Sequence, residues 1–188
     1  MRRARIRNAI LVGANLTGAD LIGASLIDAN ISNADLSGAD ISGARCSGAN
    51  FSGARFINSK LAFANLTGTN LFMADLSASI LTQSSISGSN LSKTNLSSAN
   101  LEDAFIYQAK LIEARLKGAN LKGARLIKSD LSGSDLSGAD LTDAWLDETD
   151  LKGANLNGSR LAMADLNFAN LNGTHLTGTV FQIGRAHV

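Results

Sequence analysis

Residues Ala14–Gly18 read ANLTG, and this five-residue unit decides the fold of the chain. From Ala4 to Phe181 the same register continues without insertion or deletion: a small residue is followed, two positions on, by an apolar central residue. Twenty-seven of the thirty-six central residues are leucine, and the small position holds only alanine, serine or threonine. This regularity predicts one repeated backbone unit along the whole chain.

The five-residue spacing excludes a continuous helix and a continuous strand. An α-helix turns by about 100° per residue, so successive central residues would lie about 140° apart and no face would collect them. A strand, with its period of two, would send them to opposite faces. The pattern therefore predicts a short extended side followed by a corner. The small and central residues point inward, and the residue between them points outward. Seventeen of the 18 glycines occupy the second corner position, where a positive φ is tolerated, and the chain has no proline.

Three units carry a resemblance to a known family. Ala14–Gly18 (ANLTG), Ala34–Gly38 (ADLSG) and Ala139–Asp143 (ADLTD) resemble the repeats of the pentapeptide repeat family. The resemblance covers nearly the whole chain and implies an all-β fold, the right-handed quadrilateral parallel β-helix. With four pentads per coil, residues twenty apart would stack directly. The thirty-six pentads would then form nine coils, about 40 Å long at ~4.8 Å per coil.

The register also predicts the domain organisation. Residues 1–182 are expected to form a single solenoid domain. Residues 183–188 break the pattern and are the in-frame translation of ATCGGAAGAGCACACGTC, a common sequencing-adapter sequence. We therefore expect this tail to be non-native and the gene to continue beyond it. A missing C-terminal element would leave room for a homodimer.

Few residues suggest a catalytic, redox or metal-binding role. Cys46 occupies a central position, which favours a buried core thiol over a redox or metal role, and a single cysteine forms no disulfide framework. His175 is the one histidine outside the suspect tail, and no catalytic motif accompanies it. No segment is long and apolar enough to span a membrane. We expect a non-enzymatic bacterial protein of the cytoplasm, without cofactor or metal.

Stepping through the sequence by twenty turns the outward positions into columns. Asn30, Asn50, Asn70 and Asn90 form an uncharged column that suits a ladder of side-chain amides. In other columns each basic residue has an acidic residue one coil away, which predicts weak exposed ion pairs between coils. These columns contain Asp35, Arg55 and Asp75; Asp40 and Lys60; Lys110, Asp130 and Asp150; Arg115 and Asp135; Lys128 and Glu148; Asp140 and Arg160.

The charge distribution bears on an activity that the resemblance implies. The best-known branch of the family resembles DNA: its acidic surface occupies the DNA-binding saddle of type II topoisomerases and protects them from quinolones. Such a mimic must be acidic overall, whereas this chain has 17 basic and 16 acidic residues. Its acidic stretch, 130–150, lies one coil above a basic stretch, 110–128, so that the fields largely cancel. Binding to DNA gyrase is the alternative function, and direct nucleic-acid binding is not expected.

One constellation differs from the other columns. Phe105, Arg125 and Trp145 form an outward column, and Tyr107 with Ile127 forms the column two residues along. The first three predict a cation–π stack, and aromatic residues with arginine are typical of interface hot spots. We therefore expect a protein-interaction or structural scaffold whose candidate partner-binding patch is these five residues. A cluster that satisfies only itself, or a face covered by a missing C-terminal segment, is the alternative interpretation.

Overall fold

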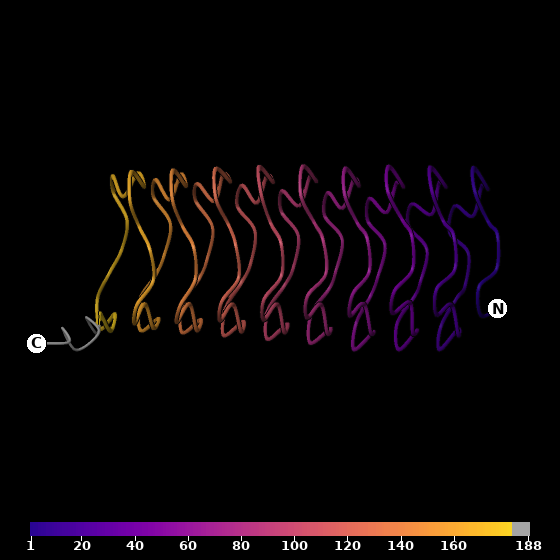
Figure 1. Ribbon diagram of the computed structural model, residues 1–188, viewed down its shortest axis with the longest axis horizontal. Coiled ribbons are helices and arrows are strands. Elements are labelled where there is room, and N and C mark those ends of the chain that lie inside the picture. The colour runs from indigo at the N-terminus through magenta and orange to yellow at the C-terminus, as the bar shows by residue number, and fades with distance from the viewer. Residues whose placement is uncertain (182–188) are drawn as a thin grey trace, which may run out of the picture.

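The computed structural model describes residues 1–181, which form a rod of stacked coils (Figure 1). The chain winds along the long axis, from Met1 at one end to the last described coil at the other. Residues 1–180 repeat a single unit of one β-bridge residue, a two-residue turn and two linking residues, and the described chain contains no helix and no longer strand. The expectation that residues 183–188 are non-native concerns a segment outside the described residues.

Neighbouring coils are related by twenty residues throughout. Every β-bridge is parallel and joins residue i to residue i+20, from Arg5 with Ser25 to Arg160 with Val180. Each side of a coil is therefore one pentad long, and four sides complete a coil. This confirms the stacking by twenty that the sequence predicts.

Backbone hydrogen bonds hold each pentad in place, as residues 40–44 illustrate. The N–H of Asp40 donates to the preceding coil at 2.9 Å, and those of Ile41 and Gly43 donate to the following coil at 2.8 and 2.9 Å. The N–H of Ala44 closes the turn on the carbonyl of Ile41 at 3.0 Å. Four of the five N–H groups thus have backbone partners, which leaves only the N–H of the first corner residue, Ser42.

The second corner residue has a positive φ in every pentad, whether or not it is glycine. Gly43 has a φ of 62°, while Phe63 and Met73 have values of 59° and 57°. The left-handed conformation costs a bulky residue on the order of 1 kcal/mol or more. From Arg3 to Gly158 the same corner N–H donates to the next coil, so the stacked ladder holds bulky residues in a conformation that they disfavour.

The core consists of the central residues and the small residues beside them. From Leu21 to Leu161 the central side chains are at most 3% exposed, and Cys46 is among them. Serines at the small position differ in their contacts: Oγ of Ser59 donates to the carbonyl of Phe56 at 2.6 Å, whereas the buried hydroxyls of Ser134 and Ser159 have no hydrogen-bond partner among the described residues. A larger side chain would not fit there, which explains why only alanine, serine and threonine occur.

Candidate functional site

Most outward positions hold aspartate or asparagine, and these side chains satisfy the fifth N–H of the pentad. Oδ1 of Asp40 accepts a hydrogen bond from the N–H of Ser42 at 3.0 Å, and Oδ1 of Asp35 accepts one from the N–H of Ser37 at 2.9 Å. Asparagine does the same: Oδ1 of Asn50 accepts from the N–H two residues later at 3.1 Å. Short polar side chains favour such local bonds. We call this contact the corner cap.

The predicted amide ladder is confirmed. Nδ2 of Asn50 donates to Oδ1 of Asn30 at 3.3 Å, and Nδ2 of Asn70 donates to Oδ1 of Asn50 at 3.2 Å. Asn90 continues the ladder onto Asn70 at 3.4 Å. The same oxygen therefore accepts from the next coil and caps its own corner.

The predicted ion pairs between coils are wrong in most columns. Of the pairs expected from the sequence, the described residues contain Arg55 with Asp35 at 3.8 Å and Lys128 with Glu148 at 3.4 Å. The corner cap uses only one oxygen of an aspartate and does not exclude an ion pair, since Asp35 both caps Ser37 and pairs with Arg55. Asp130 shows the commoner arrangement: its Oδ1 accepts a hydrogen bond from the N–H of Ser132 at 3.0 Å, and within the described chain no ion pair joins it to Lys110.

Two ion pairs lie outside the predicted columns. One joins Lys93 to Glu113 at 3.5 Å, between second corner residues of adjacent coils. The other joins Arg2 to Asp20 at 2.5 Å. The hydrogen bond from the Arg2 guanidinium holds the pKa of the Asp20 carboxyl below its ordinary value.

One side of the rod departs from the corner-cap pattern. On the side whose central residues are Ile86, Ile106, Leu126 and Leu146, the outward column reads Ser85, Phe105, Arg125, Trp145. This run of four successive coils without aspartate or asparagine is the longest in the sequence. The corner N–H groups of this run, including those of Tyr107 and Ile127, consequently have no aspartate or asparagine two residues before them. We call this side the aromatic side.

The aromatic side carries the predicted cation–π stack. The Cζ atom of Arg125 lies 5.0 Å from the centroid of the Phe105 ring and 5.5 Å from that of the Trp145 ring. Parallel bridges join Phe105 to Arg125 and Arg125 to Trp145, so the coil spacing sets the stacking distance. Phe105 remains 41% exposed and Trp145 49% exposed, which leaves both rings accessible from solvent. We call these three residues the arginine stack.

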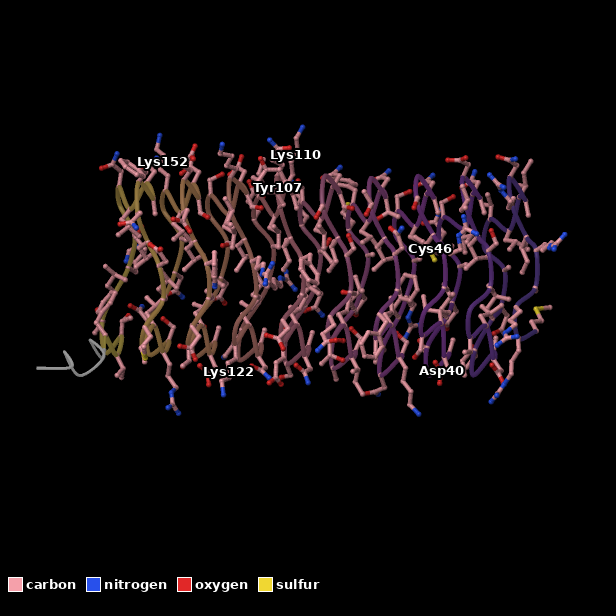
Figure 2. All side chains as sticks on the ribbon, in the orientation of Figure 1. Asp40, Cys46, Tyr107, Lys110, Lys122 and Lys152 are labelled. Atoms are coloured by element: carbon pink, nitrogen blue, oxygen red, sulfur yellow. The ribbon has the colours of Figure 1, made fainter. Side chains whose placement is uncertain are left out.

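Tyr107 and Ile127 occupy the corner at one edge of this side. Figure 2 shows Tyr107 at one margin of the rod and Lys122, on the corner that precedes Arg125, at the opposite margin. Tyr107 is 41% exposed, and Ile127 is half-buried. No ring contact joins Tyr107 to Phe105 among the described residues. The structure therefore brings together three of the five predicted residues and places the other two at a separate edge.

A groove of about 500 Å³ lies at the opposite edge, between the arginine stack and the preceding corner. Its lining residues are Gln83, Asp103, Phe105, Gly123, Arg125, Asp143 and Trp145. Neither Tyr107 nor Ile127 contributes to it.

The groove was missed by sequence reasoning, although the sequence contained its signal. Gln83, Asp103, Gly123 and Asp143 are spaced by twenty and stand two residues before the outward column of the aromatic side. Reading the second corner residues at intervals of twenty, as was done for the outward residues, would have predicted both walls of the groove. Gly123 lies between the two acidic residues, and a Cβ there would collide with Oδ1 of Asp103. The carboxylate of Asp103 thus extends along the groove floor.

Cys46 lies away from this site and is a core residue, as predicted. Burial raises the pKa of its thiol to about 12, so the group is protonated at neutral pH and unsuited to nucleophilic or metal chemistry. Residues 1–181 hold no group of three side chains arranged to bind a metal ion. No helix among them is long and apolar enough to cross a membrane.

Comparisons with known proteins agree with this architecture. A family model described as pentapeptide repeats matches residues 1–38, 34–71, 74–106, 106–143 and 144–182. The chain is similar to the crystal structure of HetL from the cyanobacterium Nostoc sp. strain PCC 7120, a pentapeptide repeat protein involved in heterocyst differentiation regulation. The two are 29% identical with a TM-score of 0.56, over 98% of this chain and 92% of HetL.

Two structures of QnrB1, a plasmid-mediated fluoroquinolone resistance protein, are also similar. A trypsin-treated variant is 23% identical with a TM-score of 0.57, over 95% of this chain and 89% of QnrB1. The full-length protein is 21% identical with a TM-score of 0.54, over 95% and 92% of the two chains. These identities establish the shared fold alone. No curated protein sequence matches the chain. The predicted right-handed quadrilateral β-helix is confirmed.

Proposed function

Because the chain belongs to the pentapeptide repeat family, we propose that it is a non-enzymatic scaffold that binds a protein partner on its aromatic side. The observation that carries this proposal is the missing corner caps. Twenty of the 36 outward residues are aspartate or asparagine and stabilise the rod, whereas four successive coils here present Ser85, Phe105, Arg125 and Trp145 instead. Residues that replace a stabilising contact with exposed aromatic surface are well suited to a binding role.

The chemistry of the arginine stack supports a protein partner. Tryptophan, tyrosine and arginine dominate the binding energy of protein interfaces, and the chain's only tryptophan and only tyrosine both lie on this side or at its edge. Arg125 is held between two rings, so its side chain loses little further entropy when a partner binds. The stacked coils provide a rigid base, and rigid surfaces bind with smaller ordering costs. The regulatory involvement of HetL, a rod of the same family, is consistent with an interaction role.

Protection of DNA gyrase by DNA mimicry remains the second candidate, and the similarity to QnrB1 is its support. At the identities observed, that similarity extends to the fold only. The balance of 17 basic against 16 acidic residues favours the scaffold, because a DNA mimic needs a strongly acidic surface.

Affinity capture with matched variants tests the proposal. The double variant Phe105→Ser/Trp145→Ser should lose the specific partner that the unmodified protein retains. Phe72→Ser/Met73→Ser is the control, since these side chains are 36% and 60% exposed on another side of the rod. Tyr107→Ser reports separately on the far edge. Equal capture by all variants would show that the aromatic side is not the binding surface.

A further inference from the structure

The groove beside the arginine stack has an acidic wall without a matching cation. Asp103 and Asp143 line it, and neither forms an ion pair with any lysine or arginine among residues 1–181. Arg125 is the one cation in the lining, and both faces of its guanidinium are covered by Phe105 and Trp145. The groove as a whole therefore has a net negative charge.

Further carboxylates surround the exposed tryptophan. Asp143 and Asp147 stand two residues before and after Trp145, and Asp165 is its bridge partner on the next coil. Asp165 caps its own corner through the N–H of Asn167 at 3.0 Å, and its second oxygen has no partner among the described hydrogen bonds. Carboxylates near an exposed ring face favour a cation there, because their negative charge offsets the repulsion from the cation on the opposite face.

The dimensions of the groove restrict the form of the ligand. The Cα atoms of Asp103 and Asp143 are two coils apart, which corresponds to about 9.6 Å along the rod axis. In a polyproline II segment, residues i and i+3 lie on the same side and are separated by about 9.3 Å. In an extended strand, by contrast, residues three apart point to opposite faces. Aromatic-lined grooves are the usual binding sites for polyproline II segments.

We propose that the groove binds a polyproline II segment of the partner that carries basic residues three positions apart, one near Asp103 and one near Asp143. This inference rests on the proposed function and specifies its partner. The apolar parts of the segment pack against Phe105 and Trp145, which line the groove. The edge of the Arg125 guanidinium donates to a carbonyl of the segment.

Trp145 fluorescence provides a direct test, because it is the only tryptophan of the chain. The probe is the capped peptide Pro-Arg-Pro-Pro-Arg-Pro. A peptide of identical composition with adjacent arginines, Pro-Pro-Arg-Arg-Pro-Pro, tests the spacing, and Pro-Glu-Pro-Pro-Glu-Pro tests the sign of the charge. We expect a saturable change in Trp145 emission with the first peptide, weaker binding of the second and none of the third.

Variants of the acidic wall complete the test. Asp103→Asn and Asp143→Asn should each weaken binding of the first peptide about three- to fivefold, the value of one exposed ion pair. Asparagine is tolerated at this corner position, since Asn33 and Asn58 already adopt the same positive φ. Asp28→Asn is the matched control: Asp28 has the same φ of 55° as Asp103, and its carboxylate likewise lies over a glycine of the next coil.

The outcomes separate this inference from the proposed function. Equal binding of the glutamate peptide, or equal affinities of Asp103→Asn, Asp143→Asn and Asp28→Asn, would overturn the cationic ligand. Equal binding of the two arginine peptides would overturn the polyproline II geometry. If no peptide binds while partner capture still depends on Phe105 and Trp145, the inference is wrong and the proposed function stands. Loss of that dependence would remove both.

Discussion

Asn50 is the position where the corner cap and the amide ladder can be measured together. Its side chain makes three hydrogen bonds: it accepts from Ser52 N–H at 3.1 Å and from Asn70 at 3.2 Å, and it donates to Asn30 at 3.3 Å. A protein hydrogen bond contributes about 0.5–1.5 kcal/mol net. Asn50→Ala should therefore lower the free energy of unfolding by about 2 kcal/mol. Asn50→Asp keeps both acceptor contacts and should lose only about 1 kcal/mol.

Equilibrium unfolding in urea, followed by circular dichroism, measures these differences. Arg45→Ala is the control, because Arg45 is an exposed outward residue whose side chain forms no hydrogen bond or ion pair within residues 1–181. Hydrogen exchange at the Ser52 amide gives a local readout, since the rod can also open in part. The reasoning would be refuted if Asn50→Ala were no less stable than Arg45→Ala, or if Ser52 exchanged at the same rate in both.

Three further predictions concern the corner cap at Arg45, the stack at Arg125 and the buried thiol of Cys46. Arg45→Asn should raise the free energy of unfolding by about 0.5–1.5 kcal/mol in urea titrations, because it supplies a cap for Ser47 and an acceptor for Asn65; an unchanged midpoint would contradict the cap. Arg125→Ala should uncover one face of Trp145 and increase acrylamide quenching of its fluorescence, whereas equal quenching would show that the stack is not populated in solution. Cys46, whose thiol has a pKa raised to about 12 by burial, should resist a thiol reagent at pH 8 until the rod unfolds; rapid labelling of the native protein would argue against a closed core.

The sequence predicted the backbone and the arginine stack because both depend on position alone. Once residues twenty apart are stacked, the spacing of Phe105, Arg125 and Trp145 equals the coil spacing, and these long side chains contact one another. The ion pairs were predicted with the same logic and were mostly wrong. Column position places the Cα atoms of Lys110 and Asp130 on adjacent coils, but it does not bring the ammonium group to the carboxylate. Charge counting contains no information about the direction of exposed side chains, and an exposed ion pair contributes too little free energy to fix that direction.

The groove illustrates a different limit of sequence reasoning. Each of its walls is a column that can be read from the sequence, but the two walls belong to different positions of the pentad. Sequence reasoning grouped Tyr107 with Phe105 because Phe105 precedes and Tyr107 follows the same central residue, Ile106. It did not group Asp103 with them, because Asp103 belongs to the corner of the preceding pentad. The rod has four corners, and the sequence pattern does not say on which edge of a side the surface is hollow. Side-chain conformation decides this: at Gly123 the carboxylate of Asp103 occupies the space that a Cβ would take.

The corner cap gives the distribution of function on this rod a physical basis. An outward aspartate or asparagine stabilises its own corner, and another residue at that position removes this acceptor; the N–H of Thr177, two residues after His175, donates instead to Oδ1 of Asn157 on the preceding coil at 2.8 Å. At Arg55 an ion pair with Asp35 replaces the cap, whereas Arg45 has neither a cap nor an ion pair within residues 1–181. The run from Ser85 to Trp145 omits four caps in succession, and the stack that replaces them has two exposed cation–π contacts, which contribute about 0.5–1 kcal/mol each. Stability alone would favour asparagine at these positions, and the binding surface that we propose would account for the residues that are found there.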